Sequence, residues 1–182
     1  AFDVQSNLVG TINFLNIAKD VGVKKVLFPS SGGTVYGIPQ FTPITEEHPT
    51  NPISSYGITK LAIEKYLALF HRLYGLDYSI LRISNVYGER QPLKNAQGLI
   101  PTIIHAALTQ QPLHVWGNGS VVRDYVHVVD VATAFLEVLD YEGETKIFNI
   151  SSGTGHTVNQ IIGMIQTQMD GYPEIIYDPA DA

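Results

Sequence analysis

The chain has 182 residues, of which 45% are hydrophobic and 15% are charged, so it can form a globular core of ordinary composition. Its formal net charge of −6 argues against nucleic acid as a partner, because phosphate backbones are held by a surplus of lysine and arginine. The lack of cysteine excludes a disulfide framework, a cysteine-based zinc site and a thiol nucleophile, and it favours a cytoplasmic protein.

The two ends of the chain indicate an internal fragment of a longer protein. The sequence has no initiating methionine and no signal-peptide pattern, and it begins inside a predicted helix near Val4. It ends shortly after a strand-like segment over 175–177. No apolar run reaches the length of a membrane span, so we expect no membrane partner.

The first half of the chain alternates helices with strands. Apolar residues recur at helical spacing over 8–18, and an apolar run over 25–28 is typical of a buried parallel strand. The small residues after this run form a loop at the carboxyl end of the strand, where open α/β sheets bind ligands. A proline-rich loop leads to a helix over 56–73, and a second strand covers 78–83. This alternation predicts a doubly wound parallel sheet.

The helix over 56–73 is amphipathic. Its apolar residues form one buried face, and Glu64, Lys65 and Arg72 supply its charges. Tyr56 and Lys60 are four residues apart at its start, so both side chains lie on one face. A nearby ammonium lowers the pKa of a phenol and makes it a base for an alcohol near neutral pH. The alternative is a core tyrosine followed by a solvated lysine.

The second half of the chain mixes shorter elements. Helices are predicted over 99–108, 131–139 and 158–169, and strands over 113–116, 147–150 and 175–177. A glycine-rich segment over 151–155 is interpreted as a turn, since it lacks the lysine of a phosphate-binding loop. The fold class is therefore α/β. Residues 1–88 are expected to form one domain, and residues 89–182 a smaller mixed lobe that is interleaved with the first and truncated at its end.

Five motifs occur in one order along the chain. They are Asn7-Leu8-Val9-Gly10-Thr11, Ser30-Ser31-Gly32-Gly33-Thr34-Val35-Tyr36-Gly37, Tyr56-x-x-x-Lys60, Arg82-x-x-Asn85-Val86-Tyr87-Gly88 and Arg123-Asp124-Tyr125-Val126-His127-Val128-x-Asp130-Val131-Ala132. Together they resemble the extended short-chain dehydrogenase/reductases, and most of all the NAD-dependent sugar-nucleotide epimerases. The resemblance runs from about residue 3 to about residue 150. It implies a Rossmann-like sheet whose amino-terminal half precedes this chain, joined to a lobe that binds the substrate.

The resemblance also implies a cofactor, NAD, and a substrate, a UDP-sugar. Tyr56 matches the catalytic base, and Lys60 matches the residue that tunes it and holds the nicotinamide ribose. With the positive charge of NAD, Lys60 is expected to lower the pKa of Tyr56. Further positions matched to the cofactor are Ser30, Ile83 and Val86. Positions matched to the substrate are Asn85, Leu99, Val115, Trp116 and Arg123.

Two of the substrate positions have a plainer alternative. Arg123 matches the arginine that grips the diphosphate, and a guanidinium fits phosphate oxygens bidentately. Its alternative role is a salt bridge with Asp124 or Asp130. Trp116 is placed to stack on the nucleotide base, although a lone tryptophan is almost as often plain core.

The third catalytic position departs from the family pattern. A serine or threonine usually lies three residues before the Val-Tyr-Gly, and this chain has Gly32 there. Ser31 is favoured as the replacement source of the hydroxyl, and Thr34 is the other candidate. The alternative is that Ser30 and Ser31 only bond the backbone of the loop.

Residues of the same loop limit which reaction of this family we expect. Dehydratases and decarboxylases of this family carry acids beside the catalytic position, where this chain has Gly33 and Thr34. We therefore expect an NAD-dependent epimerase that interconverts a UDP-sugar at C4 through a transient 4-keto intermediate. The alternatives are a 4,6-dehydratase, a decarboxylase or a keto-reductase of the same family, and a non-catalytic member that binds NAD or a nucleotide sugar.

Two further expectations concern partners. Helices over 4–20 and 56–73 resemble those that form the dimer interface of this family, so a homodimer is expected. The six histidines show no paired ligand spacing, so no metal site is expected.

Overall fold

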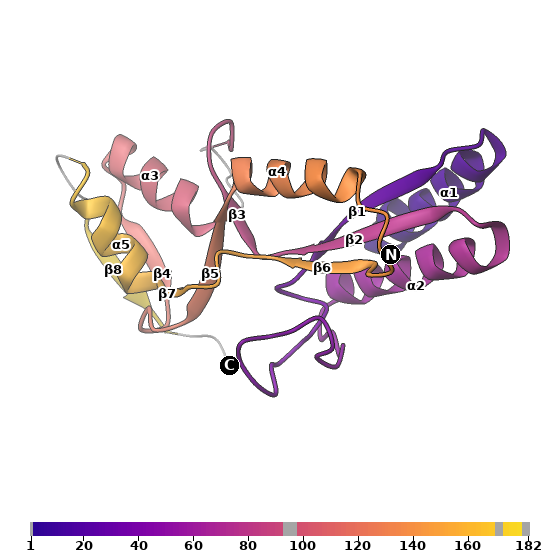
Figure 1. Cartoon of the computed structure of the whole chain (residues 1–182). Coiled ribbons are helices and arrows are strands. Elements are labelled where there is room, and N and C mark those ends of the chain that lie inside the picture. The colour runs from indigo at the N-terminus through magenta and orange to yellow at the C-terminus, as the bar shows by residue number, and fades with distance from the viewer. Residues whose placement is uncertain (1, 93–97, 170–172, 180–182) are drawn as a thin grey trace. The chain divides into compact units, whose positions relative to one another are not determined.

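The computed structural model describes residues 2–92, 98–169 and 173–179, and Figure 1 traces its helices and strands. It confirms the predicted α/β class. The chain forms two compact units, and each unit is made of two separate stretches. The first comprises residues 1–84 and 130–150, and the second comprises residues 85–129 and 151–182. Residues 85–88, which the sequence analysis assigned to the first domain, thus lie in the second unit, and a later stretch returns to the first.

The first unit is a parallel sheet with helices packed on it (Figure 1). Its elements are η1 (Val4–Val9), α1 (Gly10–Asp20), β1 (Lys25–Ser31), α2 (Ser55–Tyr74), β2 (Asp77–Ile83), α4 (Val128–Leu139) and β6 (Ile147–Ile150). The strand order is β1-β2-β6, with both pairs parallel. β2 therefore lies in the middle, and the carboxyl ends of all three strands point to the same edge of the sheet.

The helix α2 begins and ends where its sequence dictates. The Ser54 side chain accepts a hydrogen bond from the Gly57 amide and caps the first turn. Gly75 adopts the left-handed conformation that closes the last turn. Between them, Ile63, Leu67 and Phe70 recur at helical spacing and are buried against β1 and β2. Burial of this face ties the helix to the sheet.

The amino-terminal helix differs from the prediction in its winding. The residues Val4–Val9 form a π-helix before α1 begins at Gly10, whereas the apolar spacing indicated one regular helix. The Thr11 hydroxyl donates a hydrogen bond to the Asn7 carbonyl at 2.6 Å, which competes with regular backbone pairing at this point. Periodicity alone cannot show such a change, because it alters the winding without changing which residues are apolar.

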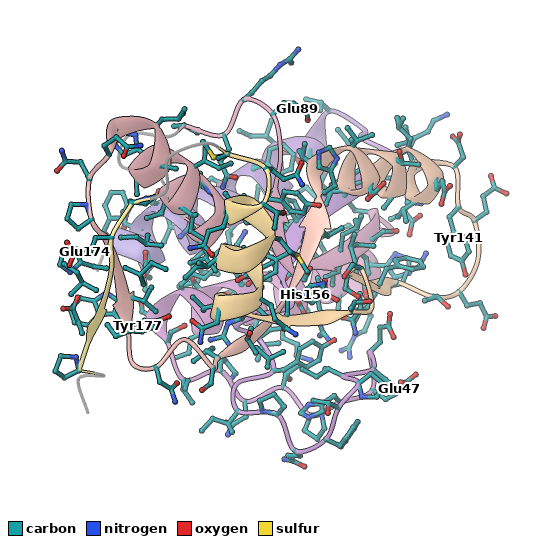
Figure 2. All side chains as sticks on the ribbon, turned by 90° about the vertical axis from the view of Figure 1, so that its left-hand side faces the viewer. Glu47, Glu89, Tyr141, His156, Glu174 and Tyr177 are labelled. Atoms are coloured by element: carbon teal, nitrogen blue, oxygen red, sulfur yellow. The ribbon has the colours of Figure 1, made fainter. Side chains whose placement is uncertain are left out.

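In the part of the second unit that the structure describes, there are two small sheets and two helices. Its elements are β3 (Asn85–Tyr87), α3 (Leu99–Thr109), β4 (Leu113–Trp116), β5 (Val122–His127), β7 (Gly155–Thr157), α5 (Val158–Gln166) and β8 (Ile175–Asp178). β5 pairs with β3 in parallel and with β7 in antiparallel fashion, while β4 pairs with β8 in parallel. In Figure 2, which looks toward α5, His156 marks β7 and Tyr177 marks β8.

A separate apolar core holds the second unit together. Its buried members are Ile103, Ala106, Leu113, Val115, Ile161 and Ile162. They come from α3, β4 and α5. The helix α5 starts with a capping box, in which Thr157 and Gln160 exchange side-chain and backbone hydrogen bonds. In the described ranges, no helix combines the length and the apolar character needed to cross a bilayer.

Candidate active site

Tyr56 and Lys60 lie in the first turns of α2, beside the end of β1. The Lys60 Nζ donates a hydrogen bond to the Pro29 carbonyl at 2.7 Å. The same ammonium lies 4.7 Å from the centre of the Phe28 ring and 5.5 Å from the centre of the Tyr56 ring. The Tyr56 side chain remains 43% exposed. The structure thus brings the phenol and the ammonium together at the carboxyl end of a parallel strand.

Burial shifts the pKa of both Tyr56 and Lys60. It raises the pKa of the Tyr56 phenol and lowers the pKa of the Lys60 ammonium. This raised pKa of Tyr56 is opposite to the lowering expected from the sequence, because the partial removal of the phenol from water disfavours the phenolate. A further positive charge bound beside the phenol would act in the opposite direction and lower the pKa of Tyr56.

The loop after β1 packs closely on β2. The Gly32 amide donates a hydrogen bond to the Ile83 carbonyl at 2.9 Å. A Cβ atom at position 32 would lie 3.1 Å from the Arg82 carbonyl oxygen, which is tighter than ordinary van der Waals contact. A serine at this position would have to push the loop away from β2. The glycine at the usual hydroxyl position thus has a physical reason in this loop conformation.

The two replacement hydroxyls differ in their surroundings. Ser31 is half-buried at the end of β1, and its carbonyl accepts the amides of Thr34 and Val35 at 3.3 and 3.1 Å. The Thr34 hydroxyl oxygen is fully buried and has no hydrogen-bond partner among the described residues. The Thr34 hydroxyl is thus closed off from solvent in this loop conformation.

A buried ion pair, which the sequence analysis missed, lies directly behind these residues. Glu64 of α2 and Arg82 of β2 are each 3% exposed, and their Oε2 and Nη2 atoms are 2.7 Å apart. The Arg82 Nε also donates to Glu64 Oε1 at 3.1 Å. The Ser30 hydroxyl donates to the same Oε1 at 2.5 Å. Ser30, which was matched to the cofactor, therefore has its hydroxyl occupied inside the protein.

The signal for this pair was present in the sequence. Glu64 was counted with the charges of an amphipathic helix, but it continues the four-residue spacing of Tyr56 and Lys60 along one face. Arg82 interrupts a strand whose neighbours are apolar. A lone arginine in a buried strand needs an acidic partner, because an unpaired buried charge is too unfavourable.

The ion pair continues into a wider network of the first unit. The Arg82 Nη1 donates to the Tyr36 hydroxyl at 2.9 Å, and this hydroxyl donates to Asn149 Oδ1 at 2.7 Å. The Asn149 amide donates to the Glu46 carboxylate at 2.7 Å. The network therefore joins α2 and all three strands to the loop before α2.

The second unit holds a cavity of about 270 Å³ alongside β3 and β5. Its walls consist of Asn85, Val86, Tyr87, Gly98, Leu99, Ile100, Pro101, Val121, Arg123, Tyr125 and Val158. Four of the residues matched to substrate or cofactor therefore meet here, namely Asn85, Val86, Leu99 and Arg123. Tyr125 also lines the cavity, although it was not among the predicted site residues.

The polar groups of the cavity are held by backbone contacts. The Asn85 Nδ2 donates to the Asp124 carbonyl at 2.8 Å, and the Arg123 Nη1 donates to the Val122 carbonyl at 2.9 Å. The Asp124 carboxylate accepts hydrogen bonds from the amide and hydroxyl of Ser152. Burial raises the pKa of the Tyr125 phenol, and the Arg123 guanidinium acts in the opposite direction. A guanidinium in a small cavity is suited to an anionic ligand.

The two remaining substrate candidates lie outside the walls of this cavity. Val115 is buried in the core of the second unit. Trp116, the next residue on β4, is 65% exposed, so the alternative that it is plain core is wrong. In residues 2–92, 98–169 and 173–179, no group of three histidine or acidic side chains is arranged to hold a metal ion.

The chain is similar to known proteins over most of its length. The model of the NAD dependent epimerase/dehydratase family matches residues 3–151. A Methanocaldococcus jannaschii protein named as a candidate UDP-glucose 4-epimerase is 43% identical over 97% of this chain and 57% of its own length. A dTDP-4-dehydro-6-deoxyglucose reductase from Escherichia coli is 37% identical over 92% of this chain and 53% of its own length.

A solved structure agrees with the fold of the whole chain. The UDP-glucose 4-epimerase of Thermotoga maritima, determined with UDP-glucose, has a TM-score of 0.91 and 38% identity over 98% of this chain. This chain covers 58% of that structure. It thus spans little more than half the length of each of these three proteins.

Proposed function

The chain belongs to the NAD-dependent epimerase/dehydratase family, and from this membership we propose that the whole protein is an NAD-dependent epimerase that interconverts a UDP-sugar at C4. The observation that carries the proposal is the pairing of Tyr56 with Lys60 beside a loop that has Gly33 and Thr34 in place of acids. A base without a neighbouring acid suits removal and return of hydrogen at one carbon, and it does not suit elimination of water.

The residues of the first unit suit the cofactor side of this reaction. Lys60 offers an ammonium donor at the carboxyl end of β1, the edge at which parallel α/β sheets bind nucleotides. Lys60 would hold the nicotinamide ribose of NAD, and the bound cofactor would supply a reversible hydride acceptor for C4 of the sugar. Tyr56 takes the proton of the 4-hydroxyl and later gives it back, and Lys60 favours the phenolate. The positive charge of oxidised NAD opposes the effect of burial on the pKa of Tyr56.

The residues of the second unit suit the diphosphate of a sugar nucleotide. Arg123 lines the cavity and has the planar donor pattern that matches phosphate oxygens. Asn85 and Leu99 line the same walls and offer one polar and one apolar contact. In this proposal, Arg123 holds the diphosphate while the 4-keto sugar turns.

A panel of UDP-hexoses tests the reaction directly. The whole protein is incubated with NAD and UDP-glucose, UDP-N-acetylglucosamine or UDP-glucuronic acid, and the products are followed by mass spectrometry and anomeric-proton NMR. A new isomer of unchanged mass supports the proposal and identifies the sugar. Loss of water or carbon dioxide indicates a dehydratase or decarboxylase instead. Unchanged sugars despite bound nucleotide indicate a non-catalytic member of the family.

The similarity to a keto-sugar reductase makes reduction the second candidate. Such an enzyme uses the same base and cofactor, but it consumes reduced cofactor once for each molecule of product. The assay separates the two, because an epimerase leaves the ratio of oxidised to reduced cofactor unchanged over many turnovers.

The third catalytic hydroxyl gives a first prediction. We expect Ser31→Ala to lower kcat on the order of 100-fold, the usual effect of removing one donor to the reacting oxygen. The reason is that Ser31 is only half-buried at the end of β1 while the Thr34 hydroxyl is fully buried. Steady-state kinetics of Ser31→Ala and of Thr34→Val, which keeps the shape of threonine, decide between them. A larger loss for Thr34→Val would reverse the assignment.

We also propose that the whole protein is a homodimer that pairs through its amino-terminal helix over 4–20 (η1 and α1) and through α2. Both helices carry large apolar side chains at the surface, among them Phe14, Ile17 and Leu73. Ile17→Asp is expected to halve the molar mass measured by light scattering, because a buried carboxylate in an apolar interface is unfavourable. The matched control is Leu108→Asp, an equally exposed leucine on α3, which should leave the mass unchanged. A monomeric unmodified protein would end this proposal.

A further inference from the structure

We propose that the buried Glu64–Arg82 pair positions Tyr56 and Lys60, because it clamps α2 onto β1 in the one placement that the reaction uses. The inference rests on the function proposed above and assigns to Glu64 the part of a positioning residue. It acts through Lys60 and Tyr56, and neither member of the pair needs to touch the substrate.

The first support is a stripe of three residues on one face of α2. Tyr56, Lys60 and Glu64 follow at four-residue intervals and therefore stand one above the other. Their exposure falls along the stripe, from the exposed Tyr56 through the half-buried Lys60 to the fully buried Glu64. The stripe thus has an exposed, reactive end at Tyr56 and a buried, fixed end at Glu64.

The second support is the pairing of this stripe with β1. Lys60 donates to the carbonyl of Pro29, and Glu64 accepts from the hydroxyl of the next residue, Ser30. Two successive turns of the helix are fastened to two successive residues of one strand. A shift of α2 along β1 that breaks one contact therefore strains the other.

The third support is that the pair fixes the helix to the middle of the sheet as well. Arg82 lies on β2, between β1 and β6, and both nitrogens on one side of its fork contact the carboxylate of Glu64. Its remaining nitrogen reaches the Tyr36 hydroxyl and the Glu46 carbonyl. Because all of these partners belong to the first unit, the helix cannot rotate without disturbing the sheet and the loop before α2.

Energetics favour a positioning role over a purely stabilising one. Removing two charges from water costs about as much as their attraction returns, and apolar residues of similar volume often serve stability equally well. The pair therefore adds little that a leucine and a methionine could not supply. What it adds is a fixed geometry, since a bidentate ion pair accepts only one relative placement of its two side chains.

The consequence for the reaction follows from distance. The ammonium of Lys60 lies 5.5 Å from the centre of the Tyr56 ring, and its support of the phenolate weakens as this separation grows. A displacement of about 1 Å in a catalytic group costs on the order of 100-fold in rate. Loss of the clamp should therefore lower kcat and raise the pH at which Tyr56 becomes a base.

Two variants that keep the local net charge constant provide the test in the whole protein. The double change Glu64→Gln with Arg82→Met removes both charges, and Glu64→Asp keeps both but shortens the reach of the carboxylate. We expect kcat to fall on the order of 10-fold to 100-fold in each folded variant, with KM nearly unchanged. We also expect the acid limb of the kcat–pH profile to move to higher pH. Because each variant conserves the local net charge, the movement of the acid limb would result from altered geometry and not from altered charge.

A matched control changes an ion pair elsewhere in the same sheet. Asp77→Asn breaks the contact between Asp77 and Lys146, which are 2.7 Å apart at the amino end of β2. It should leave kcat and the acid limb unchanged. If the double variant fails to fold, Glu64→Asp decides the question. Unmodified kcat and an unmoved acid limb in either folded variant would overturn the inference.

A direct titration separates this inference from the function on which it rests. The absorbance change of the Tyr56 phenol is obtained as the difference between titrations with and without Tyr56→Phe, first in the unmodified protein and then with Glu64→Asp. A higher midpoint with Glu64→Asp supports the clamp even when no UDP-sugar is epimerised. An unmoved midpoint contradicts the clamp even when epimerase activity is present.

Discussion

Replacing Tyr56 by phenylalanine is expected to lower kcat by roughly 100-fold to 10,000-fold, the usual contribution of a general base. The change keeps the aromatic ring beside Lys60 and removes only the hydroxyl group. Affinities for NAD and for the UDP-sugar should stay within a few-fold of the unmodified values. Steady-state kinetics and calorimetric binding on the whole protein measure the two effects separately.

The matched control is Tyr74→Phe, which removes a phenol at the opposite end of α2. Tyr74 packs edge-on against Phe70 and lies far along the helix from Tyr56. This control should retain full activity. A Tyr56→Phe protein with full activity would show that another group takes the proton, and the proposed mechanism would have to be abandoned.

The pH dependence of the unmodified protein should follow the same residue. Burial raises the pKa of Tyr56, and a base acts only when it is deprotonated. The rate should therefore rise with pH until the phenol is fully ionised and then level off. Bound oxidised NAD should move this rise to lower pH, because its positive charge favours the phenolate.

Removal of Arg82 alone is expected to lower the free energy of unfolding by about 3–5 kcal/mol, as for other broken buried pairs. In Arg82→Met, the carboxylate of Glu64 stays 3% exposed and loses its cationic partner. The hydroxyl of Tyr36 also loses a donor. Urea unfolding of the whole protein, followed by a probe in the first unit, measures the loss.

The control for this prediction is a pair of the same sheet that remains in contact with water. Lys146→Met breaks the pair with Asp77, whose side chain is 32% exposed. We expect a loss of about 0–1 kcal/mol, because solvent screens both charges. A similarly small loss for Arg82→Met would mean that water reaches Glu64, and the clamp proposed above would lose its rigidity.

The sequence predicted the long elements well because their patterns are redundant. Helix α2 was expected over 56–73 and covers Ser55–Tyr74, since an apolar face, a serine cap and a terminal glycine all agree. The strands β3 and β7 were not predicted, because three residues are too few to establish an alternation. Their existence depends on pairing with β5, which is a tertiary event.

The candidate site shows the same division between local and long-range information. The spacing of Tyr56 and Lys60 was enough to predict that they meet. The role of Glu64 was missed, because a charge on an amphipathic helix is usually solvated and only the position of Arg82 shows otherwise. The return of residues 130–150 to the first unit likewise depends on contacts between distant parts of the chain.

The exposed Trp116 serves as an intrinsic fluorescent probe, so no chemical labelling is needed. It is the single tryptophan of this chain, and it lies on β4 in the second unit. Indole fluorescence from this chain therefore originates in that unit alone, and the unit that carries Tyr56 emits only as tyrosine. A nucleotide that quenches the indole emission is therefore expected to engage the second unit, whereas a change in tyrosine emission alone does not identify the unit, because Tyr87 and Tyr125 line the cavity of the second unit. Indole emission thus reports on ligands of the second unit.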